Sequence, residues 1–152
     1  MTKQLRHQAR RAALQGLYQL DIQRLPDSTG VAEYLAPILA ESELTGAAAE
    51  YARRLAAGTW ARFPRYDEMI AAASSHWDVS RMAVVDRNIL RLALHELVEQ
   101  PDVPAKVVID EAIEIGREFG SADTAQFVNG VLDAIWKNHP VMRTARAQEQ
   151  RK

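Results

Sequence analysis

Basic side chains recur along the N-terminal segment at the spacing of one helix face. Lys3, Arg6 and Arg10 stand at positions i, i+3 and i+7, with His7 and Arg11 on their flank. Such a row can follow a nucleic-acid backbone, because each cation can neutralise a phosphate and release a bound counterion. The same spacing is also typical of a solvated helix face, since rows of charge are common on protein surfaces. The spacing alone favours the solvated face.

Aromatic and charged side chains farther along the chain also have an ordinary structural interpretation. Tyr18 fits a half-buried tyrosine whose hydroxyl lies at the rim of a core, and Phe127 fits a core aromatic. Asp86, Arg87 and Arg91 fit a surface ion-pair cluster, which contributes little stability. Residue type and spacing alone therefore give none of these side chains a function.

The patterns of the common enzyme classes are missing. The chain has no cysteine, which excludes disulfides, thiolate zinc sites and thiol nucleophiles, and its four histidines are scattered. Gly-rich phosphate loops and the GxSxG and HExxH motifs are also missing. We expect the carboxylates Asp110, Glu111 and Glu114 on the exposed side of a helix, where nothing desolvates them. We therefore expect no enzyme, no metal and no cofactor.

The elements that position these residues are all predicted to be helices. No stretch alternates apolar and polar residues over six positions between turn residues, so the predicted fold class is an all-α helical bundle. Apolar spacing, prolines and turn residues predict about seven helices, over residues 3–24, a short segment ending near 41, 45–63, 64–77, 78–100, 104–119 and 123–139. We expect N-caps at Thr45, at Asp78 or Ser80, and at Asp123, and a left-handed glycine at Gly120.

The composition predicts one compact domain with basic ends. The net charge of the 152 residues is −1, but residues 1–24 and 137–152 each carry +4, which leaves −9 for the middle. This split favours a polyanion at one place and leaves the rest for other contacts. We expect a single domain over residues 1–140 and a basic, mobile tail over 141–152. The chain shows no membrane span or signal peptide, so a soluble, cytoplasmic protein is expected.

Four segments resemble the NusB family of transcription antitermination factors. Three lie in the second half: DRNILRLALHEL (86–97), PAKVVIDEAIEIGREFG (104–120) and FVNGVLD (127–133). In the first helix, AR (9–10) followed by ALQGLYQLD (13–21) resembles the family as well. All four occur in the family's order and spacing, whereas residues 26–81 match only loosely. FVNGVLD after a helix that ends in FG is far more specific than any row of charge.

The resemblance implies an all-helical fold of two three-helix subdomains, and a function. NusB proteins bind the single-stranded boxA RNA element together with NusE, a ribosomal small-subunit protein in a second role. They thereby help the RNA polymerase antitermination complex read through terminators in ribosomal RNA operons. The resemblance implies that Arg6, Arg10, Gln126 and Phe127 bind RNA, with the aromatic ring stacking on an unpaired base, and the row of basic residues adds Lys3 and His7 to these candidates. The implied NusE-facing residues are Tyr18, Asp86, Arg87 and Arg91.

Several positions depart from the family's pattern, and two alternatives stay open. His7 and Gln8 stand where the family often has more arginines, His95 replaces a tyrosine, and Gln126 replaces a frequent lysine. One alternative is the RNA-binding domain that precedes RNA cytosine methyltransferases, although the chain leaves no room for their cofactor-binding domain. The other is a helical protein-interaction module that binds no RNA. Family members occur as monomers and as dimers, and the sequence does not choose between them.

Overall fold

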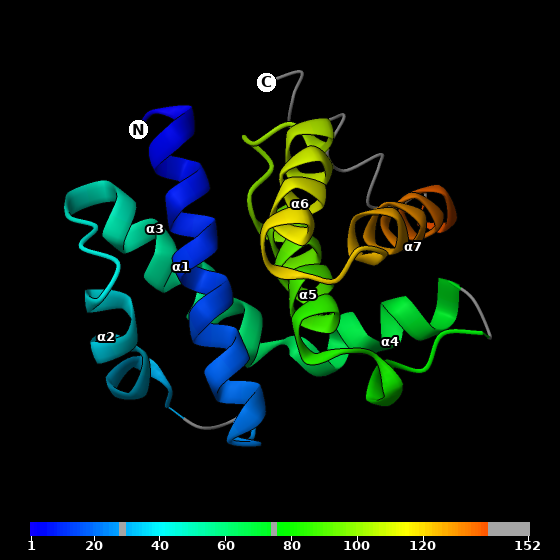
Figure 1. Ribbon diagram of the computed structural model, residues 1–152, viewed down its shortest axis with the longest axis horizontal. Coiled ribbons are helices and arrows are strands. Elements are labelled where there is room, and N and C mark those ends of the chain that lie inside the picture. Colours follow the sequence, from blue (N-terminus) through cyan, green and yellow to red (C-terminus); the bar gives the residue numbers. More distant parts are fainter. Residues whose placement is uncertain (28–29, 74–75, 140–152) are drawn as a thin grey trace. The chain divides into compact units, whose positions relative to one another are not determined.

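The computed structural model describes residues 1–27, 30–73 and 76–139, and in this part of the chain it contains helices and no strand. The elements in chain order are α1 (Lys3–Ile22), α2 (Ala32–Ala40), α3 (Gly46–Ala61), α4 (Phe63–Ala73), the 3₁₀ helix η1 (Val79–Arg81), α5 (Val84–Glu99), α6 (Ala105–Phe119) and α7 (Thr124–Asn138) (Figure 1). The predicted all-α fold with seven helices is confirmed. None of the described helices is both long enough and apolar enough to cross a membrane. The tail predicted over residues 141–152 lies outside the described residues.

The chain divides into two compact units, Met1–Phe63 and Pro64–Lys152. The first unit contains α1, α2 and α3. The second contains nearly all of α4, together with η1, α5, α6 and α7. Two subdomains were expected, but the second unit has four α-helices instead of three.

In the first unit, α1 packs against α2 and α3, and α2 also packs against α3 (Figure 1). The buried residues of α1 are mainly alanine, glycine and leucine, with Arg10 and Asp21 among them, and the small ones allow the helices to approach closely. At Gly16 a Cβ atom would lie only 2.7 Å from Leu35 Cδ2 of α2, so a side chain there would meet α2. Near the end of α3, the buried Trp60 donates from Nε1 to the carbonyl oxygen of Pro26 at 3.2 Å and so holds the segment after α1.

In the second unit, α5 packs against α6 and α7, and those two helices pack against each other. Every residue from 88 to 97 of α5 is buried, which confirms that this helix is covered on most of its circumference. Glu111 of α6 is buried as well, at 8% exposure, so the expectation of an exposed carboxylate is wrong there. Helix α4 is joined to α5 by a buried contact between the Tyr66 hydroxyl and His95 Nδ1 at 2.7 Å.

The helix ends differ most from the sequence expectations. Neither Thr45 nor Asp123 makes a side-chain capping bond, and Asp78 caps η1 instead of the long helix α5. Gly120 has φ −92° and is not left-handed. Its lack of a side chain has a steric reason, because a Cβ atom there would lie 2.4 Å from the Cβ of Thr124. A glycine is therefore required at position 120, but for a steric reason and not for the left-handed conformation that we expected.

Candidate nucleic-acid interface

The electrostatic potential at the N-terminal end of α1 is expected to be positive. Thr2 caps it, because its hydroxyl oxygen accepts from the Leu5 amide at 3.1 Å. The first turn contains no acidic residue. An uncompensated helix N-terminus attracts anions, and cationic side chains in the same turns add to that field.

The basic residues of α1 differ in how far they reach solvent. Lys3 is exposed, and Arg6 and His7 are half-buried. Arg10 is buried at 2% exposure and interacts within the protein, so it departs from the expected row. The part of the row that a phosphate can reach therefore consists of Lys3 and Arg6, with His7 on its flank.

Arg6 is held against an aromatic ring of the neighbouring helix. Its Cζ atom lies 5.5 Å from the centroid of the Tyr51 ring on α3. This distance is within the range of a cation–π interaction. Within the described residues, the buried Nε of Arg6 has no hydrogen-bond partner. Tyr51 was not among the predicted site residues, because no local spacing connects it to Arg6.

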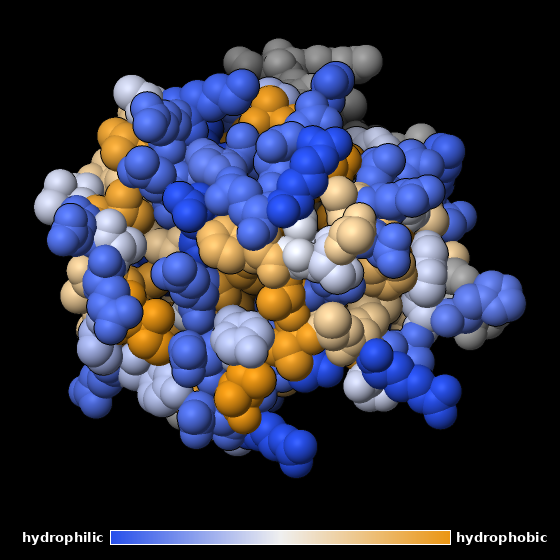
Figure 2. Space-filling model, viewed as in Figure 1, coloured by the Kyte–Doolittle hydropathy of each residue, from blue (hydrophilic) through white to orange (hydrophobic). Residues whose placement is uncertain are grey.

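The opposite end of α1 presents apolar side chains to solvent. Tyr18 is 37% exposed and Ile22, one turn later, is 48% exposed. Figure 2 shows apolar side chains at the surface over the C-terminal end of α1. Exposed neighbouring apolar side chains are typical of protein-contact surfaces. Tyr18 is thus accessible to a partner, as its predicted role requires.

In the second unit, predicted RNA-facing and partner-facing residues line one cavity. The cavity has a volume of about 400 Å³ and is lined by His76, Trp77, Asp78, Arg81, Met82, Asp86, Asp123 and Phe127. Phe127 is half-buried, and its neighbour Gln126 is exposed. The structure therefore brings Phe127 and Asp86 together, and it adds Trp77, whose aromatic type was the only signal in the sequence.

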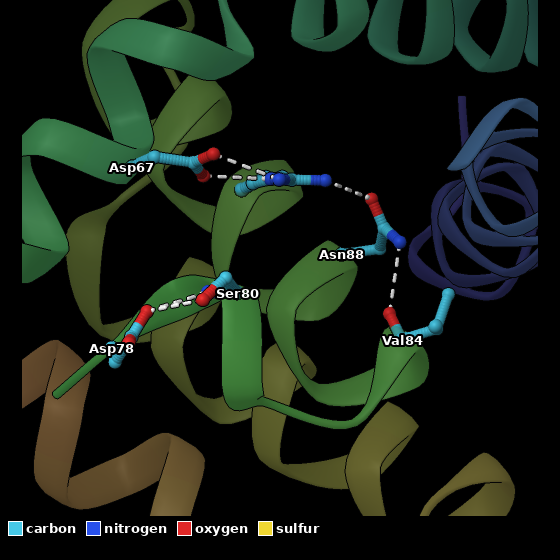
Figure 3. Close-up of polar contacts among 6 residues, drawn as sticks. Asp67, Asp78, Ser80, Val84 and Asn88 are labelled. Carbon is cyan, nitrogen blue, oxygen red and sulfur yellow. Dashed lines mark hydrogen bonds and ion pairs between the residues drawn. The ribbon is translucent and has the colours of Figure 1, made fainter. Parts of the chain in front are cut away.

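Two of the three carboxylates that line this cavity, Asp86 and Asp78, accept hydrogen bonds from hydroxyl donors. The Thr124 hydroxyl donates to Asp86 Oδ1 at 2.8 Å. Asp78 Oδ1 accepts from the Ser80 hydroxyl at 2.6 Å and from the Ser80 amide at 3.0 Å (Figure 3). These donors, with a smaller contribution from Arg81, lower the pKa of Asp78 below its usual value. The carboxylate of Asp78 is therefore held in its charged form beside the aromatic side chains.

Arg91 makes buried hydrogen bonds inside the second unit. Its Nε and Nη2 donate to Asp67 Oδ1 and Oδ2 of α4 at 2.7 and 2.8 Å, and its Nη1 donates to Asn88 Oδ1 at 3.2 Å. Asn88 in turn donates to the Val84 carbonyl at 2.8 Å (Figure 3). The expected surface ion pair is thus wrong for Arg91, which is buried at 5% exposure, whereas Arg87 is half-buried. Arg91 positions α4 and the start of α5.

No group of three histidine, cysteine, aspartate or glutamate side chains in the described residues is placed to hold a metal ion. The candidate residues of the first unit are cationic, and those of the second unit's cavity are aromatic, acidic and hydrogen-bonding. Such groups bind phosphates, bases and protein side chains.

Comparisons with known proteins identify a single family. The model of the NusB family matches residues 7–137. "Transcription antitermination protein NusB" of Symbiobacterium thermophilum is 42% identical over 134 residues, which cover 86% of this chain and 88% of that protein. The protein of the same name from Geobacter sp. (strain M21) is 40% identical over 135 residues, covering 86% and 92%.

Two solved structures have the same fold over most of the chain. NusB of T. maritima has a TM-score of 0.77 at 38% identity, covering 87% of this chain and 90% of that chain. A crystal structure of the antitermination factors NusB and NusE in complex with dsRNA has a TM-score of 0.77 at 26% identity, covering 90% and 99%.

Proposed function

Since this chain belongs to the NusB family, we propose that it is a transcription antitermination factor that binds RNA together with NusE. The RNA is the single-stranded boxA element, and the complex acts with RNA polymerase in the cytoplasm to read through terminators in ribosomal RNA operons. The family is non-enzymatic, in agreement with the expectation that the protein catalyses no reaction.

The observation that carries this proposal is the cationic N-terminal end of α1. Lys3, Arg6 and His7 reach the surface there, and the first turn of the helix holds no acidic side chain. If about three phosphates of a single strand are bound, the logarithm of the affinity falls with the logarithm of salt at a slope of roughly −2. A surface of this size gives modest affinity, so selective binding needs NusE on the same RNA.

In this proposal, the second unit contributes to base recognition through Phe127 and Gln126. Phe127 borders the cavity and presents a ring on which an unpaired base can stack. Stacking of this kind is worth about 1–3 kcal/mol per base. Gln126 is exposed beside it and can donate and accept hydrogen bonds at the edge of a base.

The proposed NusE-binding residues are Tyr18 and the pair Asp86 and Arg87. The exposure of Tyr18 beside Ile22 supports an apolar contact with a protein partner. In this proposal, the buried residues Arg10 and Arg91 position helices and do not touch RNA or NusE.

The test is charge reversal at the surface of α1. Arg6→Glu and Lys3→Glu should each weaken binding of boxA RNA, and should reduce the salt slope by about 0.7 for each phosphate that is no longer neutralised. Arg54→Glu is the matched control, because Arg54 is an exposed arginine of α3 in the same unit. Fluorescence anisotropy with labelled boxA RNA at several salt concentrations measures both quantities. Equal effects of Arg6→Glu and Arg54→Glu would remove α1 from the RNA-binding surface.

A further inference from the structure

The guanidinium of Arg6 lies over the aromatic ring of Tyr51. Tyr51 is buried at 6% exposure, so the packing of α1 on α3 fixes the position of its ring. The distance of 5.5 Å from Arg6 Cζ to the ring centroid places the cation where the electron-rich face of the ring attracts it. Arg6 is therefore restrained from outside its own helix.

This restraint changes what Arg6 offers to a ligand. An arginine on an open helix surface samples many rotamers, and ligand binding must order them. The ring restricts the guanidinium before a ligand arrives. Because Nε is buried, Nη1 and Nη2 are the donors left for a phosphate oxygen outside the protein. A planar guanidinium suits this arrangement better than an ammonium group, because it can lie against the ring while its outer N–H groups donate to a phosphate.

We propose that Tyr51 is a positioning residue for RNA binding: it does not touch RNA itself, but orients the guanidinium of Arg6 toward one phosphate. This inference rests on the proposed function, because it explains how Arg6 of α1 is oriented for binding the RNA. It adds a residue of α3 to the RNA-binding residues that the sequence placed on α1 in the first unit.

The experiment is a double-mutant cycle between the two residues. Affinity for boxA RNA is measured for the wild type, Tyr51→Leu, Arg6→Gln and the double variant, with Tyr51→Phe as the conservative control. Tyr51→Leu should weaken binding about three- to tenfold, the usual range of a cation–π contact. It should also reduce the salt slope by up to about 0.7, because Arg6 then holds its phosphate less firmly or not at all. Tyr51→Phe keeps the ring and should bind as the wild type does.

The outcomes separate positioning from a structural role. If Tyr51 acts through Arg6, Tyr51→Leu has no further effect on affinity when Arg6 is already Gln. An equal loss in both backgrounds, an equal loss for Phe and Leu, or no loss for Leu each overturns the inference. If the wild type itself does not bind boxA RNA with or without NusE, the proposed function fails and this inference fails with it. A failed cycle in a binding wild type overturns the inference alone.

Arg6→Lys tests the same claim without altering α3, in case Tyr51→Leu does not fold. The substitution keeps the charge but removes the planar guanidinium whose Cζ lies over the ring. It should weaken boxA binding severalfold while the melting temperature stays close to that of the wild type. Wild-type affinity in Arg6→Lys would show that a point charge is sufficient and would overturn the inference.

Discussion

Removal of the Asp67 carboxylate should destabilise the second unit more than any surface ion pair can. The side chain of Arg91 is 6% exposed and that of Asp67 is 24% exposed, and two bonds of 2.7 and 2.8 Å join them. In Asp67→Ala, Arg91 loses its carboxylate partner but keeps the bond of 3.2 Å to Asn88. The buried guanidinium thereby loses a carboxylate that compensates its removal from water.

The expected loss of stability is about 3 kcal/mol. Breaking a buried pair by removing one partner costs roughly 3–5 kcal/mol, and the partial exposure of Asp67 favours the lower end because water can reach the vacated space. For a chain of this size, about 3 kcal/mol lowers the melting temperature by roughly 6–12 °C. Asp67→Asn keeps one acceptor oxygen and should lose less. Urea denaturation followed by circular dichroism measures the free energy of unfolding.

The matched control is the exposed pair of Lys106 and Asp110 on α6, whose side chains are 86% and 59% exposed. Asp110→Ala should change the free energy of unfolding by no more than about 0.5 kcal/mol, because exposed pairs of this spacing contribute little. The reasoning is refuted if Asp67→Ala loses less than about 1 kcal/mol, or no more than Asp110→Ala does.

Three further predictions concern the second unit. Gly120→Ala should lower the free energy of unfolding by about 1–3 kcal/mol, because its Cβ would overlap Thr124; unchanged thermal unfolding would contradict the steric explanation. Ser80→Ala should raise the pKa of Asp78 toward its ordinary value, because the hydroxyl donor is removed. In the wild type this bond therefore stabilises the fold above the ordinary carboxyl pKa, and its contribution is lost as the pH falls through the lowered pKa; a carboxyl titration by NMR that is identical in both proteins would oppose this. Phe127→Ala should weaken boxA binding by about 1–3 kcal/mol with little change in salt slope, because stacking involves no counterion; isothermal titration calorimetry at two salt concentrations tests both parts.

The sequence was a good guide to the helices and a poor guide to their ends. Helix periods are repeated over several turns, so the apolar pattern around α5 predicted a central helix, and the structure buries it accordingly. A cap depends on one side chain and one local geometry. Thr2 caps α1 although it was not predicted, whereas Asp123 was predicted and makes no capping bond.

For the site, the sequence supplied the type of chemistry but not the packing that decides accessibility. Helical spacing placed Arg10 in one row with Lys3 and Arg6, but only the packing of neighbouring helices buries it. Arg91 and Asp67 are 24 residues apart, and no local pattern connects two such positions. The same holds for Arg6 and Tyr51, because long-range pairs become visible only in the fold.

In the proposed function, this protein recognises one RNA sequence and does so together with a protein partner. The most direct measurement compares its binding to boxA RNA and to a scrambled RNA of equal length, each with and without purified NusE. We expect weak, salt-sensitive binding of boxA by the protein alone, and clearly tighter binding of boxA, but not of the scrambled RNA, when NusE is present. Equal affinity for the two RNAs in the presence of NusE, or no RNA binding in low salt, would show that the protein is not a boxA-specific adaptor.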